Sequence, residues 1–255
     1  MRQTPKGTIS IVSHGHGPLV GHLLRDLALQ DDIAEWLVVL TLNIPEEINE
    51  EDLKGLRAII VRNEGAKGFG ANHNAASKVA EGYLFAIVNP DIRLPTTDML
   101  VQFVSMEWDM SQPALRAPIV VAPDGTREDS VRRNLSVPNL IHRTRNRASG
   151  WEVDPEGTDF YWLAGMFLIA PLVTFRALGG FDERFRLYCE DYDLSARWRL
   201  AGGRVEVIKT VEVVHDARRD SRRSFRHMRW HVASLLRVWR SRPFWKIVTA
   251  PRREA

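Results

Sequence analysis

Residues 8–88 alternate short apolar runs with stretches of helical periodicity, and this alternation restricts the fold more than any other feature. The run Trp36–Leu42 is apolar at almost every position, which is typical of a strand covered on both faces in a parallel sheet. Between the run Thr8–Val12 and this strand, the spacing of Leu19 to Leu27 predicts an amphipathic helix. A strand, a loop and a helix in this order open a doubly wound sheet, whose ligands collect at the carboxyl ends of the strands. We therefore expect an α/β fold with a single Rossmann-like, mostly parallel sheet flanked by helices.

The composition is that of a soluble chain that can bury a full core. With 255 residues, 44% of them hydrophobic, the chain can form one α/β domain or two small ones. The single cysteine, Cys189, excludes an internal disulfide, and no Cys/His cluster has zinc spacing. Any bound metal must therefore be held by oxygen ligands with at most one histidine. No apolar run is long enough to span a bilayer and the N-terminus lacks a signal-peptide core, so we expect a cytoplasmic protein.

Two loops follow predicted strands and reach the carboxyl edge of the sheet. The loop Ser13-His14-Gly15 follows the first strand, and its histidine is either a plain loop residue or a nucleotide contact. A glycine-rich turn follows a third strand, Ala58–Val61, and leads into a helix; it has neither the GxGxxG nor the GxxxxGK[ST] pattern. It is either an ordinary tight turn or a place where the backbone approaches a diphosphate or ribose. Its candidate binding residues are Asn63, Gly65, Gly68, Gly70, Asn72 and Asn74.

A further buried strand, Tyr83–Val88, brings Asn89-Pro90-Asp91 to the same edge. A carboxylate beside a diphosphate requires a cation, and Mg²⁺ or Mn²⁺ bridging carboxylates and phosphates is the usual arrangement. Asp91 is therefore the candidate metal ligand, and Asn89 a candidate substrate contact. A simple Asn-Pro-Asp turn is the alternative.

Several carboxylates cluster where a helix is predicted to begin, near Asp191. Leu194, Trp198 and Ala201 recur at helical spacing, and Gly202-Gly203 ends the run. A helix N-terminus favours negative charge, so Glu190 and Asp191 are placed to stay ionised and to accept a proton. The alternative is that these acids only cap the helix. Because a helix turns about 100° per residue, Asp193 would point roughly 200° away from Asp191, and only one of them can face a site.

Four segments together resemble glycosyltransferase family 2, the inverting nucleotide-sugar enzymes with the GT-A fold. Residues 181–197 match the pattern FDE-x-F-x-x-Y-x-EDxDL-x-x-R, and residues 63–74 match N-x-G-x-x-G-F-x-x-x-x-N. Asn89-Pro90-Asp91 is similar to the DxD motif, with Asn89 in place of its first Asp, and Trp162 to Gly165 are similar to the W-x-x-G segment. The strand Trp36–Leu42 departs from the family, because Thr41 and Asn43 stand where an Asp usually reads the base.

The resemblance implies roles for individual residues. It makes Asp191 the general base, with Glu190 the next candidate, and makes His215 the partner of Asp91 at the metal. It also makes Trp162 and Gly165 candidate substrate contacts, although a tryptophan ring suits a core equally well. The implied reaction moves a sugar from a nucleoside-diphosphate donor, dTDP-rhamnose first and a UDP-sugar second, to a glycan or lipid-linked acceptor in bacterial surface polysaccharide synthesis.

The C-terminal tail differs electrostatically from the rest of the chain. Residues 215–255 hold twelve Lys/Arg against three Asp/Glu, while the whole chain has a net charge of +3. We expect a basic helical segment that either packs on the domain or attaches peripherally to the cytoplasmic leaflet through residues 222–253. Arg222 could instead reach a diphosphate. The expected division is a nucleotide-sugar half at 1–110, an acceptor and catalytic half at 111–215, and the tail at 216–255.

Two other function classes share some of these features. A nucleotidyltransferase would use a similar sheet and metal carboxylate, but the lysine-bearing glycine-rich loop it usually carries near residue 15 is absent. A nucleic-acid-binding protein would explain the basic tail, but the carboxylate clusters would repel phosphates. We therefore expect no nucleic-acid partner, and the sequence leaves the oligomeric state open.

Overall fold

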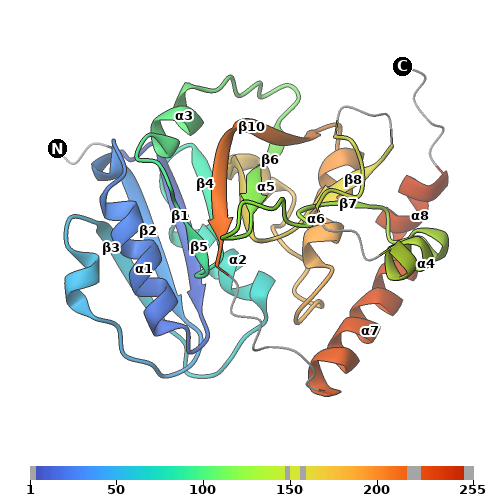
Figure 1. The fold of residues 1–255 in the computed structure, drawn as a ribbon, viewed down its shortest axis with the longest axis horizontal. Helices are drawn as coiled ribbons and strands as arrows, with labels where there is room; N and C mark the ends of the chain where they lie inside the picture. The colour runs from blue at the N-terminus through green and yellow to red at the C-terminus, as the bar shows by residue number, and fades with distance from the viewer. Residues whose placement is uncertain (1–3, 147–149, 156–158, 217–224, 250–255) are drawn as a thin grey trace.

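A computed structural model describes residues 4–146, 150–155, 159–216 and 225–249, and it contains one large twisted sheet between layers of helices (Figure 1). The sheet has eight strands in the order β3-β2-β1-β4-β9-β6-β10-β5, and β7 and β8 form a separate two-stranded sheet. The strands are β1 (Gly7–Ser13), β2 (Trp36–Leu42), β3 (Arg57–Arg62), β4 (Leu84–Val88), β5 (Ile92–Arg93), β6 (Ala114–Val121), β7 (Val131–Arg133), β8 (Tyr161–Leu163), β9 (Phe167–Pro171) and β10 (Arg204–His215).

The helices cover both faces of the large sheet, as the apolar strands require. The α-helices are α1 (Gly17–Ala28), α2 (Phe69–Val79), α3 (Met99–Ser105), α4 (Val137–Asn146), α5 (Leu172–Ala177), α6 (Glu190–Leu200), α7 (Phe225–Trp239) and α8 (Arg242–Thr249), and two short 3-10 helices are η1 (Ile33–Glu35) and η2 (Glu50–Leu53). Val38 and Leu40 of β2 pack with α1 and α3, whereas Leu37 and Val39 pack with α2, α5 and α6. Alternate side chains of a strand point to opposite faces, so a strand buried on both faces is apolar throughout.

The first half of the sheet is parallel, as expected. Strand β1 pairs in parallel with β2 and β4, and β2 pairs in parallel with β3. Strand β9 runs antiparallel between β4 and β6, while β10 pairs in parallel with β6. The expectation of a mostly parallel α/β sheet flanked by helices is confirmed.

The apolar run over residues 160–169, which fits a single strand by composition, does not form one. The structure has two strands there, because β8 pairs with β7 whereas β9 pairs with β4 in the large sheet. The segment Ala164–Met166 connects the two sheets, and its Gly165 N–H donates to Asp191 instead of to a neighbouring strand. The apolar run is therefore continuous in sequence but not in hydrogen bonding.

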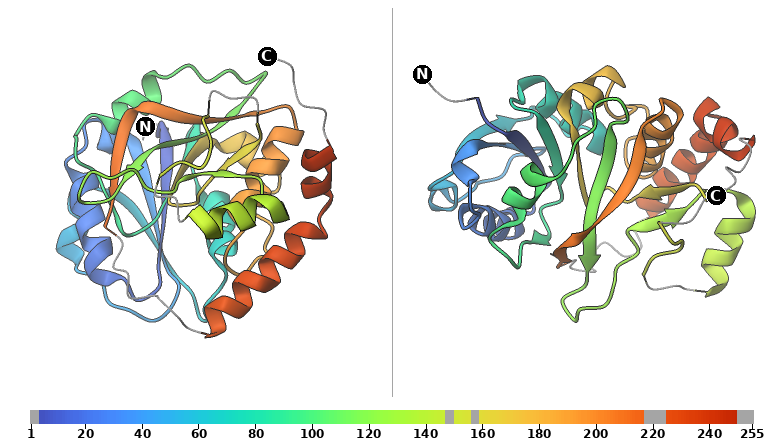
Figure 2. Two further views of the ribbon diagram at one scale, coloured as in Figure 1. Left: turned by 45° about the vertical axis from the view of Figure 1, so that its right-hand side comes forward. Right: turned by 90° about the horizontal axis from the view of Figure 1, so that it is seen from above.

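The C-terminal helices pack on the side of the molecule away from α1 (Figures 1 and 2). Val238 of α7 and Phe244 of α8 join a core cluster with Trp162 and Tyr192. The Ser234 hydroxyl donates to the Leu187 carbonyl oxygen at 3.0 Å. The described part of the tail is therefore part of the fold. Arg222 lies outside the described residues, and the division of the chain at residues 110 and 215 stays a prediction.

Candidate active site

A cavity of about 740 Å³ lies at the carboxyl edge of the sheet, between the starts of α2 and α6. It brings together loops that follow β1, β2 and β4, and α7 closes part of its wall. Of the residues expected from the sequence, those that line this cavity are His14, Asn72, Asn89, Asp91, Gly165, Glu190 and Asp191. Segments separated by more than a hundred positions in the chain thus meet at one site.

Asp191 lies in the first turn of α6 and is held by two backbone hydrogen bonds. Its Oδ2 accepts from the Gly165 N–H at 3.0 Å, and its Oδ1 accepts from the Tyr192 N–H at 2.9 Å. Burial raises the pKa of Asp191, while the nearby Arg132 and these backbone donors oppose that rise. A half-buried carboxylate fixed in this way, at the wall of a cavity, is suited to accept a proton from a bound hydroxyl.

Glu190, the neighbouring carboxyl, is in a different state. Its side chain is only 4% exposed, and its Oε2 has no hydrogen-bond partner among the described residues. Burial and the adjacent Asp191 charge raise the pKa of Glu190 to about 8. The two residues before it, Tyr188 and Cys189, both have left-handed backbone angles, with φ of 73° and 65°.

Asp193 points away from the cavity, as the helical rotation predicted. Its Oδ2 accepts from Arg197 Nε at 2.7 Å, and it is 4% exposed. Arg197 also donates to the carbonyl oxygens of Leu178 and Gly180. Asp193 therefore anchors the loop before α6.

Asp91 and His215 lie side by side because the short strand β5 pairs with the end of β10. Residue 215 is opposite Ile92 in this pairing, and the Asp216 N–H donates to the Asp91 carbonyl oxygen at 2.8 Å. His215 Nε2 lies 3.2 Å from Asp91 Oδ2, and its Nδ1 lies 3.8 Å from Glu128 Oε1. Burial alone would raise the pKa of Asp91, but the hydrogen bond and charge of His215 hold that pKa below its usual value.

The side chains of Asp91 and His215 fit a divalent cation that also binds the phosphates of a substrate. Asp91 Oδ1 is buried and has no hydrogen-bond partner, so a ligating oxygen is free, and oxygen with imidazole nitrogen suits Mg²⁺ or Mn²⁺. Within the described residues no cluster of three or more His, Cys, Asp or Glu is placed to hold a metal. Mg²⁺ at sites of this kind usually keeps several waters and also binds substrate phosphates.

The glycine-rich turn is shaped more by packing than by an open approach to a ligand. A Cβ added at Gly68 would lie 2.8 Å from the Arg186 carbonyl oxygen, and one at Gly70 would lie 2.5 Å from Phe181 Cβ. Gly65 has open space around it. The first turn of α2 thus packs closely on the loop that precedes α6.

The two asparagines of this turn have different surroundings. Asn72 lines the cavity and accepts from Asn63 Nδ2 at 2.7 Å. Asn74 instead pairs with the backbone of Phe181: its Oδ1 accepts from the Phe181 N–H at 2.8 Å, and its Nδ2 donates to the Phe181 carbonyl oxygen at 2.9 Å. Asn74 therefore joins α2 to the loop before α6, and it does not line the cavity.

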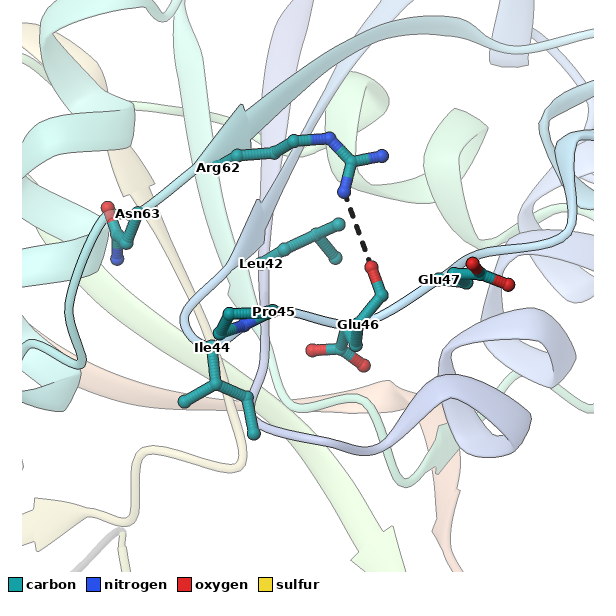
Figure 3. Close-up of a pocket in the computed structure, with 7 residues that line it drawn as sticks. All are labelled: Leu42, Ile44, Pro45, Glu46, Glu47, Arg62 and Asn63. Carbon is teal, nitrogen blue, oxygen red and sulfur yellow. Dashed lines mark hydrogen bonds between the residues drawn. The ribbon is translucent and has the colours of Figure 1, made fainter.

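The loop after β1 is organised by Glu46, which sequence reasoning did not single out. The Ser13 hydroxyl donates to Glu46 Oε2 at 2.7 Å, and the Gly15 N–H donates to Oε1 at 3.1 Å. Glu46 also lines a second pocket of about 490 Å³ after β2 and β3, where Arg62 donates to its carbonyl oxygen (Figure 3). Asn63 is in this second pocket, so Ser13, Gly15 and Asn63 support the cavity from outside it.

Trp162 belongs to the core and not to the cavity wall. It is 3% exposed, and its Nε1 donates to the Arg133 carbonyl oxygen at 2.8 Å. Arg132 Cζ lies 5.0 Å from the centre of its ring, and Arg132 itself lines the cavity. Trp162 therefore supports a cationic side chain of the site.

The cavity also has an aromatic and basic wall that the sequence did not predict. Tyr188 Oη lies 2.9 Å from His227 Nδ1, and Arg186 Cζ lies 5.2 Å from the centre of the Trp230 ring. All four residues line the cavity. No spacing in the sequence connects the loop before α6 with a helix about forty positions later; the only signal was the mixture of basic and aromatic residues in the tail.

Comparison with known proteins gives consistent matches. No protein-family profile matches the chain. The chain is 28% identical over 241 residues to the rhamnosyltransferase WbbL of Escherichia coli K12, covering 90% of both. It is 29% identical over 145 residues to N-acetylglucosaminyl-diphospho-decaprenol L-rhamnosyltransferase of Mycobacterium tuberculosis, covering 51% of this chain and 45% of that protein.

The fold agrees with solved glycosyltransferases. A mannosyltransferase of Pyrobaculum calidifontis, in complex with GDP-Man and Mn²⁺, superposes with a TM-score of 0.62 at 16% identity, covering 96% of this chain and 68% of that one. Residues 1–349 of S. aureus TarS, in complex with UDP-GlcNAc, superpose with a TM-score of 0.60 at 17% identity, covering 85% and 61%. The chain is a GT-A glycosyltransferase. The expected resemblance to family 2 rhamnosyltransferases is confirmed, and polysaccharide synthesis is the setting it supports.

Proposed function

We propose that this glycosyltransferase transfers L-rhamnose from dTDP-rhamnose to a hydroxyl of a lipid-linked glycan, with inversion at the anomeric carbon; a UDP-sugar is the second candidate donor. The rhamnosyl donor and the lipid-linked acceptor are supported by the names of the relatives. The observation that carries the chemistry is Asp191, a carboxylate held by the Gly165 and Tyr192 N–H groups at the cavity wall.

In the proposed reaction the acceptor oxygen attacks the anomeric carbon while its proton passes to Asp191. The bond between that carbon and the diphosphate oxygen breaks, and the nucleoside diphosphate leaves with its electron pair. A divalent metal, when bound by Asp91 and His215, would offset the negative charge of the diphosphate. Asn72, Asn89 and His14 surround the proposed donor region of the same cavity.

The acceptor is proposed to enter along the wall formed by Arg186, Tyr188, His227 and Trp230. An indole ring offers a flat apolar face to a sugar, and Arg132 and Arg186 offer positive charge to a diphosphate carrier. This wall lines the same cavity as Asp191; Arg186 and Tyr188 come from the loop before α6, and His227 and Trp230 come from α7. It is therefore placed to orient an acceptor hydroxyl toward the base.

The donor can be tested by thermal shift with a panel of nucleotide sugars, each with and without Mn²⁺. A ligand present at 100 times its dissociation constant stabilises the fold by about 2.7 kcal/mol, which is a readable shift. We expect dTDP-rhamnose to give the largest shift in the presence of Mn²⁺, and Asp91→Asn to remove the Mn²⁺ dependence. If only another nucleotide sugar raised the melting temperature, its sugar would replace rhamnose in the proposal. The proposed metal site would be wrong if Mn²⁺ altered no nucleotide's effect.

We also propose that α7 and α8 rest on the membrane surface that holds the acceptor. The apolar residues of α7 divide between two environments: Leu235 and Trp239 pack on the core, while Met228 is 61% exposed. The exposed apolar side chains of this surface are Met228, Val232, Leu236, Trp245 and Val248. They are interspersed with the exposed basic residues Arg229, Arg240, Arg242 and Lys246. A basic residue near an anionic surface contributes about 1 kcal/mol, and apolar side chains insert at the interface.

No helix in the described part of the chain is long and apolar enough to cross a bilayer. The proposed attachment is therefore tested by flotation with anionic and with neutral vesicles. Met228→Ser, Val232→Ser and Leu236→Ser combined should abolish binding to anionic vesicles without lowering the melting temperature. The matched control replaces three exposed apolar residues elsewhere, Leu29, Val79 and Val173, by serine and should still float. Equal flotation of both triple variants, or no flotation of the parent protein at low salt, would refute this surface.

A further inference from the structure

The carboxyl of Glu190 is buried at the cavity and lacks a partner on one oxygen. Its Oε2 accepts and donates no hydrogen bond within the described chain, although the residue lines the cavity and is 4% exposed. Most buried polar side-chain atoms in folded proteins have a partner, so an orphaned carboxyl oxygen at a cavity requires an explanation. Because Oε2 itself is shielded from solvent, the carboxyl has to turn toward the cavity for a group of the bound substrate to supply the missing partner.

Glu190 and Asp191 are adjacent in sequence but differ in hydrogen bonding. Asp191 accepts from the backbone N–H groups of Gly165 and Tyr192, which favour its ionised form. The backbone N–H groups of Tyr188 and Glu190 also act on the Glu190 carboxyl, but they do not outweigh its burial and the adjacent Asp191 charge, and its Oε2 has no donor. When two neighbouring carboxyls cannot both ionise, the proton resides on the one whose charge is less stabilised. The geometry therefore assigns the charge to Asp191 and the proton to Glu190.

The backbone before α6 supports a specific placement of this carboxyl. Tyr188 and Cys189 are consecutive non-glycine residues with left-handed angles, a combination that L-residues adopt unfavourably. Such strained conformations are concentrated at functional sites. Here the turn makes Glu190 the first residue of α6 and brings it to the cavity beside Asp191.

We propose that Glu190 is a neutral carboxylic acid whose Oε2–H donates a hydrogen bond to a substrate oxygen beside Asp191. The inference rests on the proposed role of Asp191 as base. Glu190 keeps its proton throughout the reaction, and Asp191 takes the proton of the acceptor hydroxyl. A neutral donor orients the sugar without adding a second negative charge near the departing diphosphate.

The electrostatic surroundings agree with this protonation state. Burial and the charge of Asp191 raise the pKa of Glu190 to about 8, so the acid is mostly neutral at pH 7. The other titratable or charged groups near the pair come from the loop before α6, from β7, from α4 and from α7. They are Tyr188, Cys189, Arg132, Arg143, His227 and His231.

The first test compares Glu190→Gln with Glu190→Leu across the pH range. Glutamine keeps a neutral donor of the same shape, so kcat/KM at about pH 7 should fall by less than about fivefold, whereas leucine should lose about 10- to 100-fold. Parent activity should decline above about pH 8 as Glu190 ionises, and Glu190→Gln should lack that decline. A loss of about 100-fold or more in Glu190→Gln would mean that the ionised carboxylate is needed. An unchanged alkaline decline in Glu190→Gln would assign the titration elsewhere. Either result would overturn the proposal.

The second test needs no substrate and so separates this inference from the proposed function. Infrared difference spectra between the parent protein and Glu190→Gln should show a protonated carboxyl band at about pH 7 that disappears by about pH 9.5. The same subtraction with Glu183→Gln, an exposed glutamate in the loop before α6, is the control and should show no such band. The absence of the Glu190 band from the folded parent protein at pH 7 would overturn the proposal even if transfer activity is confirmed.

Discussion

Helices α2 and α6 both begin at the cavity, yet their first turns are chemically opposite. Neither has a side-chain hydrogen bond at its N-cap; the Phe69 N–H of α2 donates to the Arg186 carbonyl oxygen, the Tyr192 N–H of α6 donates to Asp191, and both helix starts carry the positive end of a helix dipole. The first turn of α2, which begins after Gly68, contains no acidic residue. The first turn of α6 contains Glu190, Asp191 and Asp193.

The difference shows how one physical feature serves two purposes. The N-terminus of α2 is left uncompensated, which favours an anionic ligand such as the diphosphate of the proposed donor. The N-terminus of α6 stabilises carboxylates that belong to the protein and can accept a proton. Close packing joins the two ends, because Gly68, just before α2, and Gly70, in its first turn, lie against the loop that carries Phe181 and Arg186 into α6.

The largest expected effect is on the reaction rate. Asp191→Asn should lower kcat by about 10² to 10⁴, because the amide cannot take the acceptor proton, while the melting temperature should change little. Steady-state transfer assays with a circular-dichroism melt of the same preparation measure both quantities. Near-normal turnover of this variant would mean that Asp191 is not the base, and that the acidic first turn of α6 does not serve to accept the proton.

Asp193→Asn, on the same turn of α6, should have the converse effect. It breaks the buried pair with Arg197 and should cost about 3 kcal/mol of unfolding free energy, with kcat of the folded fraction retained. Urea denaturation measures the loss. If Asp193→Asn remained as stable as the parent but lost turnover, the functional carboxylate would have been assigned to the wrong side of α6.

A smaller effect is expected at Asn74 of α2. Asn74→Ala leaves the buried N–H and carbonyl oxygen of Phe181 without their partner, which should cost about 1 to 3 kcal/mol of stability. The KM for the donor should remain near that of the parent. Asn72→Ala is the matched variant at the cavity and should raise the KM for the donor. If Asn74→Ala raised this KM and Asn72→Ala did not, Asn74 would belong to the binding site.

Two opposite pH dependences of stability are also expected. His73 of α2 is fully buried, and burial lowers its pKa to about 3 from the ordinary 6.5, so its contribution to stability is lost as the pH falls below 6.5. Between pH 7 and pH 6 that loss is about 0.7 kcal/mol. Glu190 has a raised pKa, so the folded state binds its proton more tightly and stability falls as the pH rises from about 4.5 to 8.

Urea midpoints at several pH values would test this pair. His73→Gln should flatten the acid side of the stability curve, and Glu190→Gln should flatten the side above about pH 5. If Glu190→Gln left the dependence on pH unchanged, its carboxyl would be ionised in the folded protein.

Local patterns in the sequence were sufficient for most of the framework. The strand Trp36–Leu42 is observed with the predicted bounds, and α6 ends before Gly202, which has φ of 88°. The spacing of apolar residues and the glycines that end helices depend on only a few neighbouring residues, so they predict strands and helices without knowledge of the fold. Helical rotation likewise predicted that Asp191 and Asp193 point in different directions, and the family resemblance selected Asp191.

Contacts between distant segments could not be read in the same way. Asn72 and Asn74 look alike in the sequence. The position of the loop over residues 181–186 decides that Asn72 lines the cavity, whereas Asn74 makes hydrogen bonds with the backbone of Phe181. Trp162 was compatible with a core or a sugar platform, and the packing of Tyr192 and Arg132 around it decided for the core.

The sequence by itself thus determined the alternating strands and helices of residues 8–88 and the helix start that bears Asp191, because these depend on neighbours along the chain. The tertiary structure alone decided which side chains share the cavity, since α7 contributes His227 and Trp230 to a wall that begins forty residues earlier. It also decided the burial of Glu190, on which the proposed protonation of this carboxyl rests. Burial and the distribution of backbone donors between adjacent carboxyls depend on the packing of the whole fold, and no local pattern encodes them.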